Sequence, residues 1–348
     1  MDLRAFIDLL AHEGRLRRVS REVDWKFELG EMVRAHRSPI LFEKIKDYPR
    51  ARVFANGLSG MVEIGLALGL GAGLKRRDLI RELKRRKPSP LHTTAVPTGP
   101  VLENVSAGEA IDLLRFAVPH WHRQDCGRYL GTWHINVSKH PETGARNVGV
   151  YRMALLGPRQ ATISTSPASH LGLHVAAAER RGQPLPMAVA IGVSEAVVMA
   201  ASAAYPYGLD EFDLAGGLQR ESVRLLPCET VNLEVPADSE IVIEGVIKPG
   251  VRVPDGPFFD YAGKPSVNPH AFLFEATRVM SRNDPIFRGA SIGMAGAEDH
   301  QLAAVLANLD LLDFHGNRTR ERLQHYLIKN QWFKAFQWAG RIGGILRG

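Results

Sequence analysis

The sequence contains little cysteine: its 348 residues include only two, Cys126 and Cys228. A disulfide framework needs several pairs, and two cysteines this far apart form no zinc-binding pattern, so both classes of protein are excluded. A window of about 20 apolar residues, as a membrane-spanning helix requires, is also missing, because residues such as Glu63 and Glu195 interrupt the most apolar stretches. The N-terminal segment, 1–18, includes acidic side chains and favours an amphipathic helix over a signal peptide. We therefore expect a cytoplasmic protein.

The composition is that of an ordinary globular protein. Apolar residues make up 45% and charged residues 23%, which excludes collagen-like, low-complexity and disordered chains. The 44 basic and 37 acidic residues give a net charge of +7. This excess favours anionic ligands but is spread too evenly to indicate nucleic-acid binding, so we expect no nucleic-acid partner. The length predicts two or three domains.

The first part of the chain alternates helical and β-prone segments. Apolar periodicity predicts helices over residues 3–14 and 27–37, and strands over 16–23, 40–42 and 52–55. This alternation indicates an α/β domain over residues 1–95, followed by a Pro/Ser/Thr-rich linker at 87–100. The basic helix predicted over 75–87 is either a surface for an acidic or phosphate-bearing partner or a solvated helix face, and we favour the second.

The sequence pattern changes between residues 96 and 296. Short β-prone runs separated by Pro and Gly predict an antiparallel barrel or sandwich there. Helices are expected to interrupt the strands near 168–182 and 194–204. The predicted strands span residues 132–137, 147–154, 161–164, 187–191, 222–226, 231–235 and 240–247.

The remaining segment, residues 297–348, is predicted to be a helical tail. Its final part, 322–348, contains no acidic residue and interleaves basic with aromatic side chains. Such a helix either lies on a membrane surface or a partner, or packs on its own domain, which we favour.

The segment Asn147-Val-Gly-Val-Tyr-Arg152 combines an amide oxygen with a guanidinium group. Asn offers an oxygen to a hard cation, and Arg offers a fixed fork to a carboxylate or phosphate. Because the two are five positions apart, a regular strand would place them on opposite faces, so a shared site requires the strand to bend or end. A capped strand with an exposed Arg is the simpler interpretation of the segment alone.

The segment Ser169-His170-Leu-Gly-Leu-His174 places two histidines at positions i and i+4, on one face of a predicted helix. No acidic residue lies between them as a metalloprotease would need. Either histidine could bind a metal or could be a buried core residue.

Two acidic segments complete the candidate chemistry. Asp210-Glu211 precedes a mostly apolar segment, 212–217, which we interpret as a turn. Pro254-Asp255-Gly-Pro-Phe-Phe-Asp260 places two carboxylates around a predicted tight turn. Paired buried carboxylates can act as acid and base, although Asp-Gly is also a common turn former.

Together these segments resemble the UbiD family of reversible decarboxylases. The resemblance rests on five motifs in order: NVGVYR, SHLGLH, LDEFDLAGGL, VPADSEIVIEG and DGPFFD. VDWKFELGEMV and PILFEKIKDYP resemble the family's amino-terminal domain, so the likeness extends over roughly residues 1–300. It implies an α+β fold: an N-terminal α/β domain over 1–95, a central split β-barrel of the flavin-reductase type over 96–296, and the helical tail where the family usually has a second α/β domain.

The resemblance implies a cofactor and a metal. Members of the family use prenylated FMN (prFMN), made by a UbiX-like flavin prenyltransferase, with a divalent metal that is usually Mn²⁺ and often with K⁺. Asn147, His170 and Glu211 resemble the metal ligands. The residues that resemble the cofactor-binding set are Asn147, Val148, Gly149, Val150, Tyr151, Arg152, Ser169, His170, Leu171, Gly172 and Glu211.

The resemblance also implies catalytic residues. Arg152, Asp255 and Asp260 match the family's network of one Arg and two acidic residues, with Asp260 as the proton donor. Asp255 stands where the family usually has a longer Glu, and Phe259 stands where it usually has Gly.

Two functions follow from the resemblance. The favoured one is a carboxy-lyase acting on an aromatic or α,β-unsaturated acid, as a homo-oligomer or in a hetero-subunit complex, with membrane association only through the C-terminal basic helix. The alternative is a degenerate subunit that holds flavin or a partner without turnover. An ordinary FMN oxidoreductase would explain neither the metal-type residues nor the acidic segment.

Overall fold

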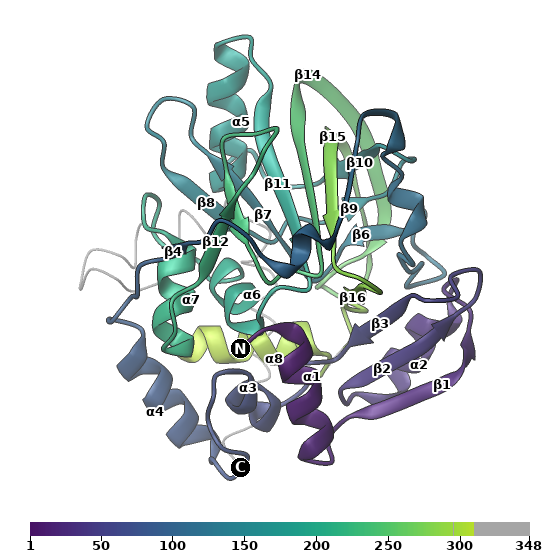
Figure 1. Ribbon diagram of the computed structural model, residues 1–348, viewed down its shortest axis with the longest axis vertical. Coiled ribbons are helices and arrows are strands. Elements are labelled where there is room, and N and C mark those ends of the chain that lie inside the picture. The colour runs from purple at the N-terminus through teal and green to yellow at the C-terminus, as the bar shows by residue number, and fades with distance from the viewer. Residues whose placement is uncertain (295, 310–348) are drawn as a thin grey trace.

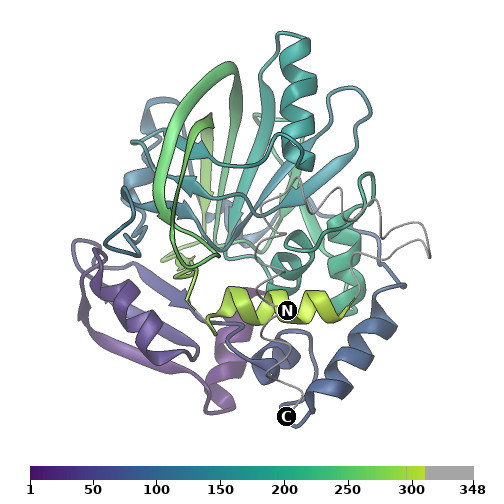
Figure 2. The ribbon, with the colours of Figure 1, turned by 180° about the vertical axis from the view of Figure 1, so that it is seen from behind.

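The computed structural model describes residues 1–294 and 296–309 (Figure 1). In Figure 1 a large curled sheet lies above the N-terminal elements. Helix α8 (Glu298–Asn308) runs between these two parts, as the view from behind also shows (Figure 2). The C-terminal basic helix expected over 322–348 lies outside the described residues.

The N-terminal elements form a four-stranded sheet with order β1-β2-β3-β16. Strands β1 and β2 are parallel, β2 and β3 antiparallel, and β16 pairs in parallel with β3. The last strand therefore returns from far along the chain to complete a sheet that β1, β2 and β3 begin. The strands are β1 (Arg17–Val23), β2 (Ile40–Ile45), β3 (Arg52–Ala55) and β16 (Ile286–Arg288).

Four helices accompany this sheet, and their ends follow local chemistry. Asp2 caps α1 by accepting a hydrogen bond from the N–H of Ala5. Leu29 and Val33 of α2 are buried with the sheet residues Val23 and Phe42. The helices are α1 (Leu3–His12), α2 (Glu28–His36), α3 (Met61–Ala67) and α4 (Arg76–Arg86).

The large sheet is antiparallel and has seven strands, in the order β10-β15-β14-β11-β7-β8, with β5 also pairing to β15. Strand β11 reads LPMAVAI and lies between β14 and β7, so alternate residues enter two separate cores: Ala188 and Ala190 one, Met187 and Val189 the other. The strands are β5 (Asn104–Ala107), β7 (His134–Lys139), β8 (Arg146–Gly149), β10 (Gln160–Ile163), β11 (Leu185–Ile191), β14 (Ile241–Phe259) and β15 (Pro265–Ser281).

Shorter elements surround this sheet. Helices α5 (His170–Arg180), α6 (Glu195–Ala201) and α7 (Glu211–Gln219) interrupt the strand sequence. Two small sheets have the orders β13-β12-β4 and β6-β9. Their strands are β4 (Thr94–Ala95), β6 (Tyr129–Gly131), β9 (Met153–Ala154), β12 (Arg224–Pro227) and β13 (Glu234–Pro236), and the 3-10 helices are η1 (Pro100–Glu103), η2 (Gly108–Ala110) and η3 (Leu113–Arg115).

The mixed α+β architecture with a curled half-barrel sheet is the fold class that the sequence predicts. Two local predictions are wrong. Residues 212–217 form the body of α7 and not a turn, because Asp210 caps a helix there by accepting from the N–H of Phe212. Residues 254–259 form the end of β14 and not a tight turn, because β15 pairs with them as far as Phe259 and Pro265.

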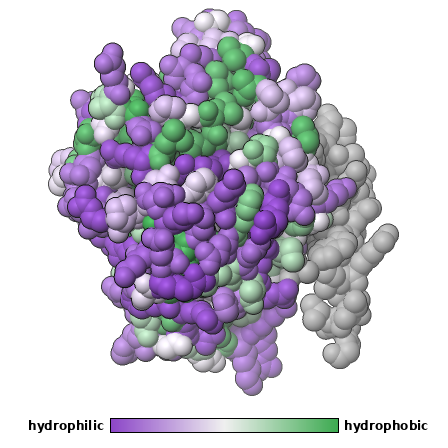
Figure 3. Space-filling model, turned by 90° about the vertical axis from the view of Figure 1, so that its right-hand side faces the viewer, coloured by the Kyte–Doolittle hydropathy of each residue, from purple (hydrophilic) through white to green (hydrophobic). Residues whose placement is uncertain are grey.

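Figure 3 shows one side of the molecule, on which hydrophobic side chains gather mainly in the upper part, over the large sheet. Within the described residues, no helix combines the length and the apolar character needed to cross a membrane.

Candidate active site

The end of β8 separates Asn147 from Arg152. Strand β8 stops at Gly149, and the chain turns so that the N–H of Tyr151 donates to Oδ1 of Asn136, at 3.2 Å. The Tyr151 ring folds back over Gly149, where an added Cβ would lie 2.6 Å from the ring. The strand therefore ends between the two residues, but their side chains belong to two different polar clusters.

The first cluster gathers the three residues that resemble metal ligands. Oε2 of Glu211 accepts a hydrogen bond from the N–H of Val148, at 2.9 Å, and Oε1 lies 4.0 Å from Nδ1 of His170. Asn147, adjacent to Val148, has its amide 3.4 Å from the hydroxyl of Tyr151. Strand β8 and the first turns of α5 and α7 thus bring one amide, one imidazole and one carboxyl group into one region.

Burial sets the charge of this cluster. It raises the pKa of Glu211 to about 8 and lowers the pKa of His170, so both groups favour their neutral forms. A bound cation would reverse the preference of Glu211, and an amide oxygen, an imidazole and a carboxylate are suitable donors for a divalent metal. Among the described residues, no group of three or more His, Cys, Asp or Glu side chains is placed to hold a metal.

The cofactor-like segments lie at the same place. Ser169 caps α5 by accepting from the N–H of Gly172 at 3.0 Å, and Thr165 donates to the Ser169 hydroxyl. The N–H of Leu171 donates to the hydroxyl of Tyr151, at 3.4 Å. These contacts connect the segment 148–152 to the first turn of α5.

His174 does not join His170 in a metal-type pair. Its ring is fully buried, its Nδ1 lies 2.9 Å from the hydroxyl of Ser138, and burial lowers its pKa to about 3. The i,i+4 spacing therefore places one histidine beside Glu211 and the other in the core.

The second cluster is centred on Arg152 and Asp255. Nε of Arg152 donates to Oδ1 of Asp255 at 2.7 Å, and Nη1 donates to the hydroxyl of Ser266 at 2.6 Å. Asp255 is 1% exposed and also accepts a hydrogen bond from the hydroxyl of Thr162, while the Tyr129 hydroxyl lies 3.5 Å away. The shorter Asp side chain thus reaches Arg152 directly.

Asp260 lies further along the chain than Asp255, just beyond β14. Its Oδ1 accepts a hydrogen bond from the N–H of Ala262, at 2.9 Å, and its side chain is only half-buried. The described residues show no hydrogen bond or ion pair between Asp260 and Arg152. The structure therefore brings Asp255 and Arg152 together, whereas Asp260 has its carboxylate turned to its own loop.

Sequence reasoning missed Asp125. Its carboxyl group is buried, accepts hydrogen bonds from the backbone N–H groups of Phe259 and His122, and has its pKa raised by burial to about 6. The only signal in the sequence is a polar group within the segment PHWHRQDCGRYLG, which carries no recognisable spacing.

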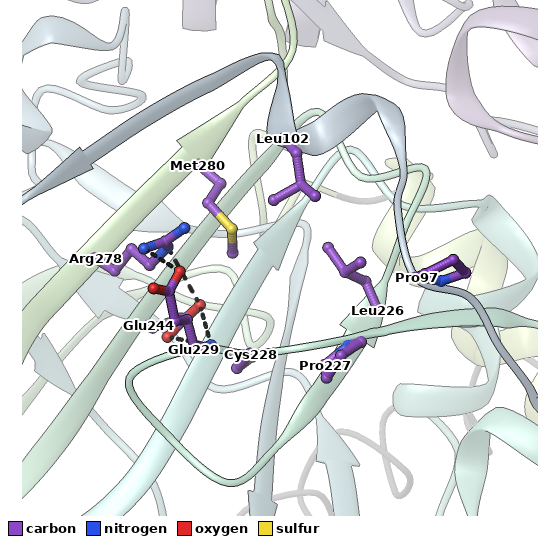
Figure 4. Close-up of a pocket in the computed structure, with 9 residues that line it drawn as sticks. All are labelled: Pro97, Leu102, Leu226, Pro227, Cys228, Glu229, Glu244, Arg278 and Met280. Atoms are coloured by element: carbon purple, nitrogen blue, oxygen red, sulfur yellow. Dashed lines mark hydrogen bonds and ion pairs between the residues drawn. The ribbon is translucent and has the colours of Figure 1, made fainter.

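A cavity of about 290 Å³ lies apart from both clusters (Figure 4). Leu102, Leu226 and Met280 line it, and Glu244 and Arg278 lie at one end. Glu244 already accepts a hydrogen bond from the N–H of Thr230, at 2.6 Å. None of the residues that line the cavity belongs to the Arg152–Asp255 or Glu211–His170 cluster.

The fold and these clusters define a class: a split β-barrel protein with a buried Arg–Asp pair beside an Asn–His–Glu set. The chain matches the model of the 3-octaprenyl-4-hydroxybenzoate carboxy-lyase Rift-related domain over residues 93–295, and the corresponding N-terminal domain over residues 7–87. The chain belongs to the UbiD family, as its motifs predict. The matched family is one of carboxy-lyases, the enzyme class expected from the sequence.

Named relatives agree with this assignment. The chain is 33% identical to pyrrole-2-carboxylic acid decarboxylase of Pseudomonas aeruginosa, over 91% of this chain and 67% of that protein. It is 30% identical to phenolic acid decarboxylase of Bacillus subtilis, over 85% of this chain and 65% of that protein. The chain thus spans about two thirds of the length of these relatives.

Solved structures show the same fold. The UbiD-class enzyme HmfF of Pelotomaculum thermopropionicum, in an evolved dimeric form in complex with prFMN, superposes with a TM-score of 0.81 at 32% identity, covering 88% of this chain and 70% of that one. Vanillic acid decarboxylase (ShVdcCD) of Sedimentibacter hydroxybenzoicus gives 0.84 at 29% identity, covering 88% and 67%.

Proposed function

We propose that this protein catalyses the reversible, non-oxidative decarboxylation of an aromatic or α,β-unsaturated carboxylic acid, using prFMN and a divalent metal. The observation that carries the proposal is the buried Arg152–Asp255 pair, 2.7 Å apart, in a chain of the UbiD family. Because Asp255 and Ser266 fix the guanidinium, Arg152 is oriented before any substrate arrives.

The residues present fit the proposed metal and flavin. Glu211 is a buried carboxyl group whose pKa rises to about 8, and a cation beside it would offset that cost of burial. Asn147, His170 and Glu211 would hold Mn²⁺, and a K⁺ ion is proposed with it. The segments 148–152 and 169–172 would hold the flavin.

The chain's own residues would do the following. Arg152 would bind the substrate carboxylate, and Asp255 would keep the guanidinium in place. When bound, prFMN supplies a covalent attachment point that stabilises the electron pair left when carbon dioxide departs. Asp260 would deliver the proton to that carbon, which requires its carboxyl group to turn away from Ala262.

We propose three units, residues 1–95, 96–296 and 297–348, and the family matches over 7–87 and 93–295 support the first boundary. A UbiX-like prenyltransferase would supply the cofactor. Assembly with further copies of the chain is supported by the dimeric form of HmfF, and assembly with another subunit is the alternative we propose. The cytoplasmic location stays a prediction.

The proposal is tested by producing the chain together with a flavin prenyltransferase and measuring its ultraviolet–visible spectrum and manganese content. We expect bound modified flavin and Mn²⁺, with Mn²⁺ lost in Glu211→Ala and retained in Glu142→Ala. Glu142 is the matched control because it is exposed on the loop before β8.

Turnover is then assayed with pyrrole-2-carboxylic and vanillic acids. Decarboxylation, or isotope exchange of the substrate carboxylate with carbon dioxide, is expected in the wild type and lost in Arg152→Ala. A loaded protein without either reaction contradicts the proposal and favours the flavin-holding subunit.

A further inference from the structure

The loop of residues 120–128 holds the end of β14. Asp125 on this loop is 6% exposed, and its Oδ1 accepts the N–H of Phe259 at 2.7 Å. The N–H of the next residue, Cys126, donates to the carbonyl of Pro257 at 2.7 Å. Two successive loop residues therefore bind the strand at positions 257 and 259, immediately before Asp260.

A ring contact also joins the 120–128 loop to the end of β14. The imidazole of His122 stacks on the ring of Phe259, with centroids 4.4 Å apart and an interplanar angle of 21°. Nε2 of His122 lies 3.1 Å from the carbonyl oxygen of Ile292. The other oxygen of Asp125 accepts the N–H of His122 at 3.1 Å, so the carboxylate holds both the histidine and the strand.

The segment 291–293 also approaches Asp260. Gly293 has φ +88°, and a Cβ added there would lie 2.1 Å from the carbonyl oxygen of Asp260. Only glycine allows this approach. The backbone at 259–260 thus contacts both the 120–128 loop and the segment 291–293, while the Asp260 side chain accepts from the N–H of Ala262 within its own loop.

A carboxylate at position 125 is costly, because burial raises its pKa to about 6 although Arg34 and Arg152 act against the rise. A neutral amide would fill the same space but offers one acceptor oxygen where the carboxylate uses two. The two N–H groups bound here therefore explain why an acid occupies this position.

We propose that Asp125 is a positioning residue, which fixes the backbone of Phe259 and Asp260 so that the Asp260 carboxyl group turns about a fixed point between its own loop and the substrate. This role rests on the proposed function, in which Asp260 is the proton donor. Asp125 acts through Phe259 and does not itself touch the reacting carbon.

The first test measures hydrogen–deuterium exchange of peptides that contain residues 257–262. In Asp125→Ala we expect the Phe259 amide to exchange at least about 10-fold faster, because the loss of a charge-assisted hydrogen bond is of that order. Asp8→Ala is the matched control, since Asp8 is exposed on α1. If Asp125→Ala does not fold, Asp125→Asn keeps the shape of the side chain and one acceptor, and the same acceleration is expected at a smaller size.

The second test separates kcat from KM with the loaded enzyme and pyrrole-2-carboxylic or vanillic acid. Asp125→Asn is expected to lower kcat by as much as about 100-fold, as misplacement of a reacting group can, with KM nearly unchanged. The pH dependence of kcat should also shift, because the surroundings of the proposed proton donor, Asp260, change.

The outcomes are distinct. Unchanged exchange at Phe259, or faster exchange with an unchanged kcat in an active enzyme, contradicts the positioning role. A wild type that binds prFMN and Mn²⁺ but turns over no acid contradicts the proposed function instead.

Discussion

At the scale of single residues, the structure divides the polar residues of the site into two clusters. Asn147, His170 and Glu211 lie in one cluster and Arg152 and Asp255 in another, whereas Asp260, which the family resemblance groups with Arg152, faces its own loop. Asp125 and Thr162 were not predictable, since each is defined by a partner far along the chain: Phe259 for Asp125, and Asp255 for Thr162. The spacing of residues within a short motif cannot predict a contact between such distant parts of the chain.

Three buried histidines predict a strong loss of stability in acid. Burial lowers the pKa of His122 and His134 to about 4 and that of His174 to about 3. The ordinary pKa of histidine is near 6.5, so above that pH these side chains are neutral in both the folded and the unfolded protein. As the pH falls from 6.5 toward 4, the unfolded chain binds protons that the folded protein does not, and the free energy of unfolding decreases. Each histidine is expected to lower the free energy of unfolding by up to about 2 kcal/mol between about pH 6.5 and pH 5.

Urea unfolding at pH 7.5 and at pH 5.0 measures this dependence. His134→Leu should show a smaller loss between the two conditions than the wild type. His270→Leu, at an exposed position, should not differ from it. Equal losses in all three proteins would contradict the assignment to His134.

At the scale of elements, sequence patterns predict most strands and helices as far as β14 but miss β15. Its segment, PSVNPHAFLFEATRVMS, contains two prolines and a polar half, which weakens the β signal. Pairing with β14 forms the strand all the same, because β14 and β15 extend side by side from Ile241–Ser281 to Phe259–Pro265. The same pairing makes the Asp255 segment a strand, so tertiary contacts override the local turn signal of Asp-Gly.

The start of α7 depends on Arg146 of β8. Its guanidinium donates to Asp210 at 2.7 Å and to Glu234 of β13 at 2.7 Å. Because Asp210 is the N-cap of α7, this contact holds the capping carboxylate at the start of the helix. Arg146→Ala leaves two partly buried carboxylates without this partner and is expected to reduce the free energy of unfolding by about 1–3 kcal/mol.

Hydrogen exchange shows which part of the chain is destabilised by Arg146→Ala. Amides in the first turn of α7 should exchange faster in Arg146→Ala and be unchanged in Arg180→Ala, an exposed arginine in the last turn of α5. Uniform acceleration over the whole chain would contradict a local role for Arg146.

At the scale of the whole molecule, one buried ion cluster joins three parts of the chain. Arg288 is 1% exposed and binds Glu195 of α6 at 2.7 Å and Glu298 of α8 at 2.6 Å. Glu298 also accepts the N–H groups of Asn56 and Leu58, at 2.8 and 3.2 Å. The N-terminal sheet, the large sheet with its helices, and α8 therefore share one set of charges.

This cluster predicts cooperative unfolding. Arg288→Ala is expected to cost about 3–5 kcal/mol, because it leaves two carboxylates buried without their cation. Calorimetry should show one transition at a lower Tm. Arg50→Ala, at an exposed position, should leave Tm nearly unchanged. Two resolved transitions in Arg288→Ala would show instead that the parts unfold independently.

The parallel pairing of β16 with β3 has a consequence for anyone who shortens this chain. A fragment that ends before Ile286 leaves the outer edge of β3 without its neighbour, along a strand whose Val53 and Phe54 are fully buried in the whole protein. An uncovered apolar edge of this kind is a template for strands of other molecules and promotes aggregation. Expression designs for the first part of the protein therefore need a substitute for residues 286–288, such as a fused strand or a charged side chain placed on that edge.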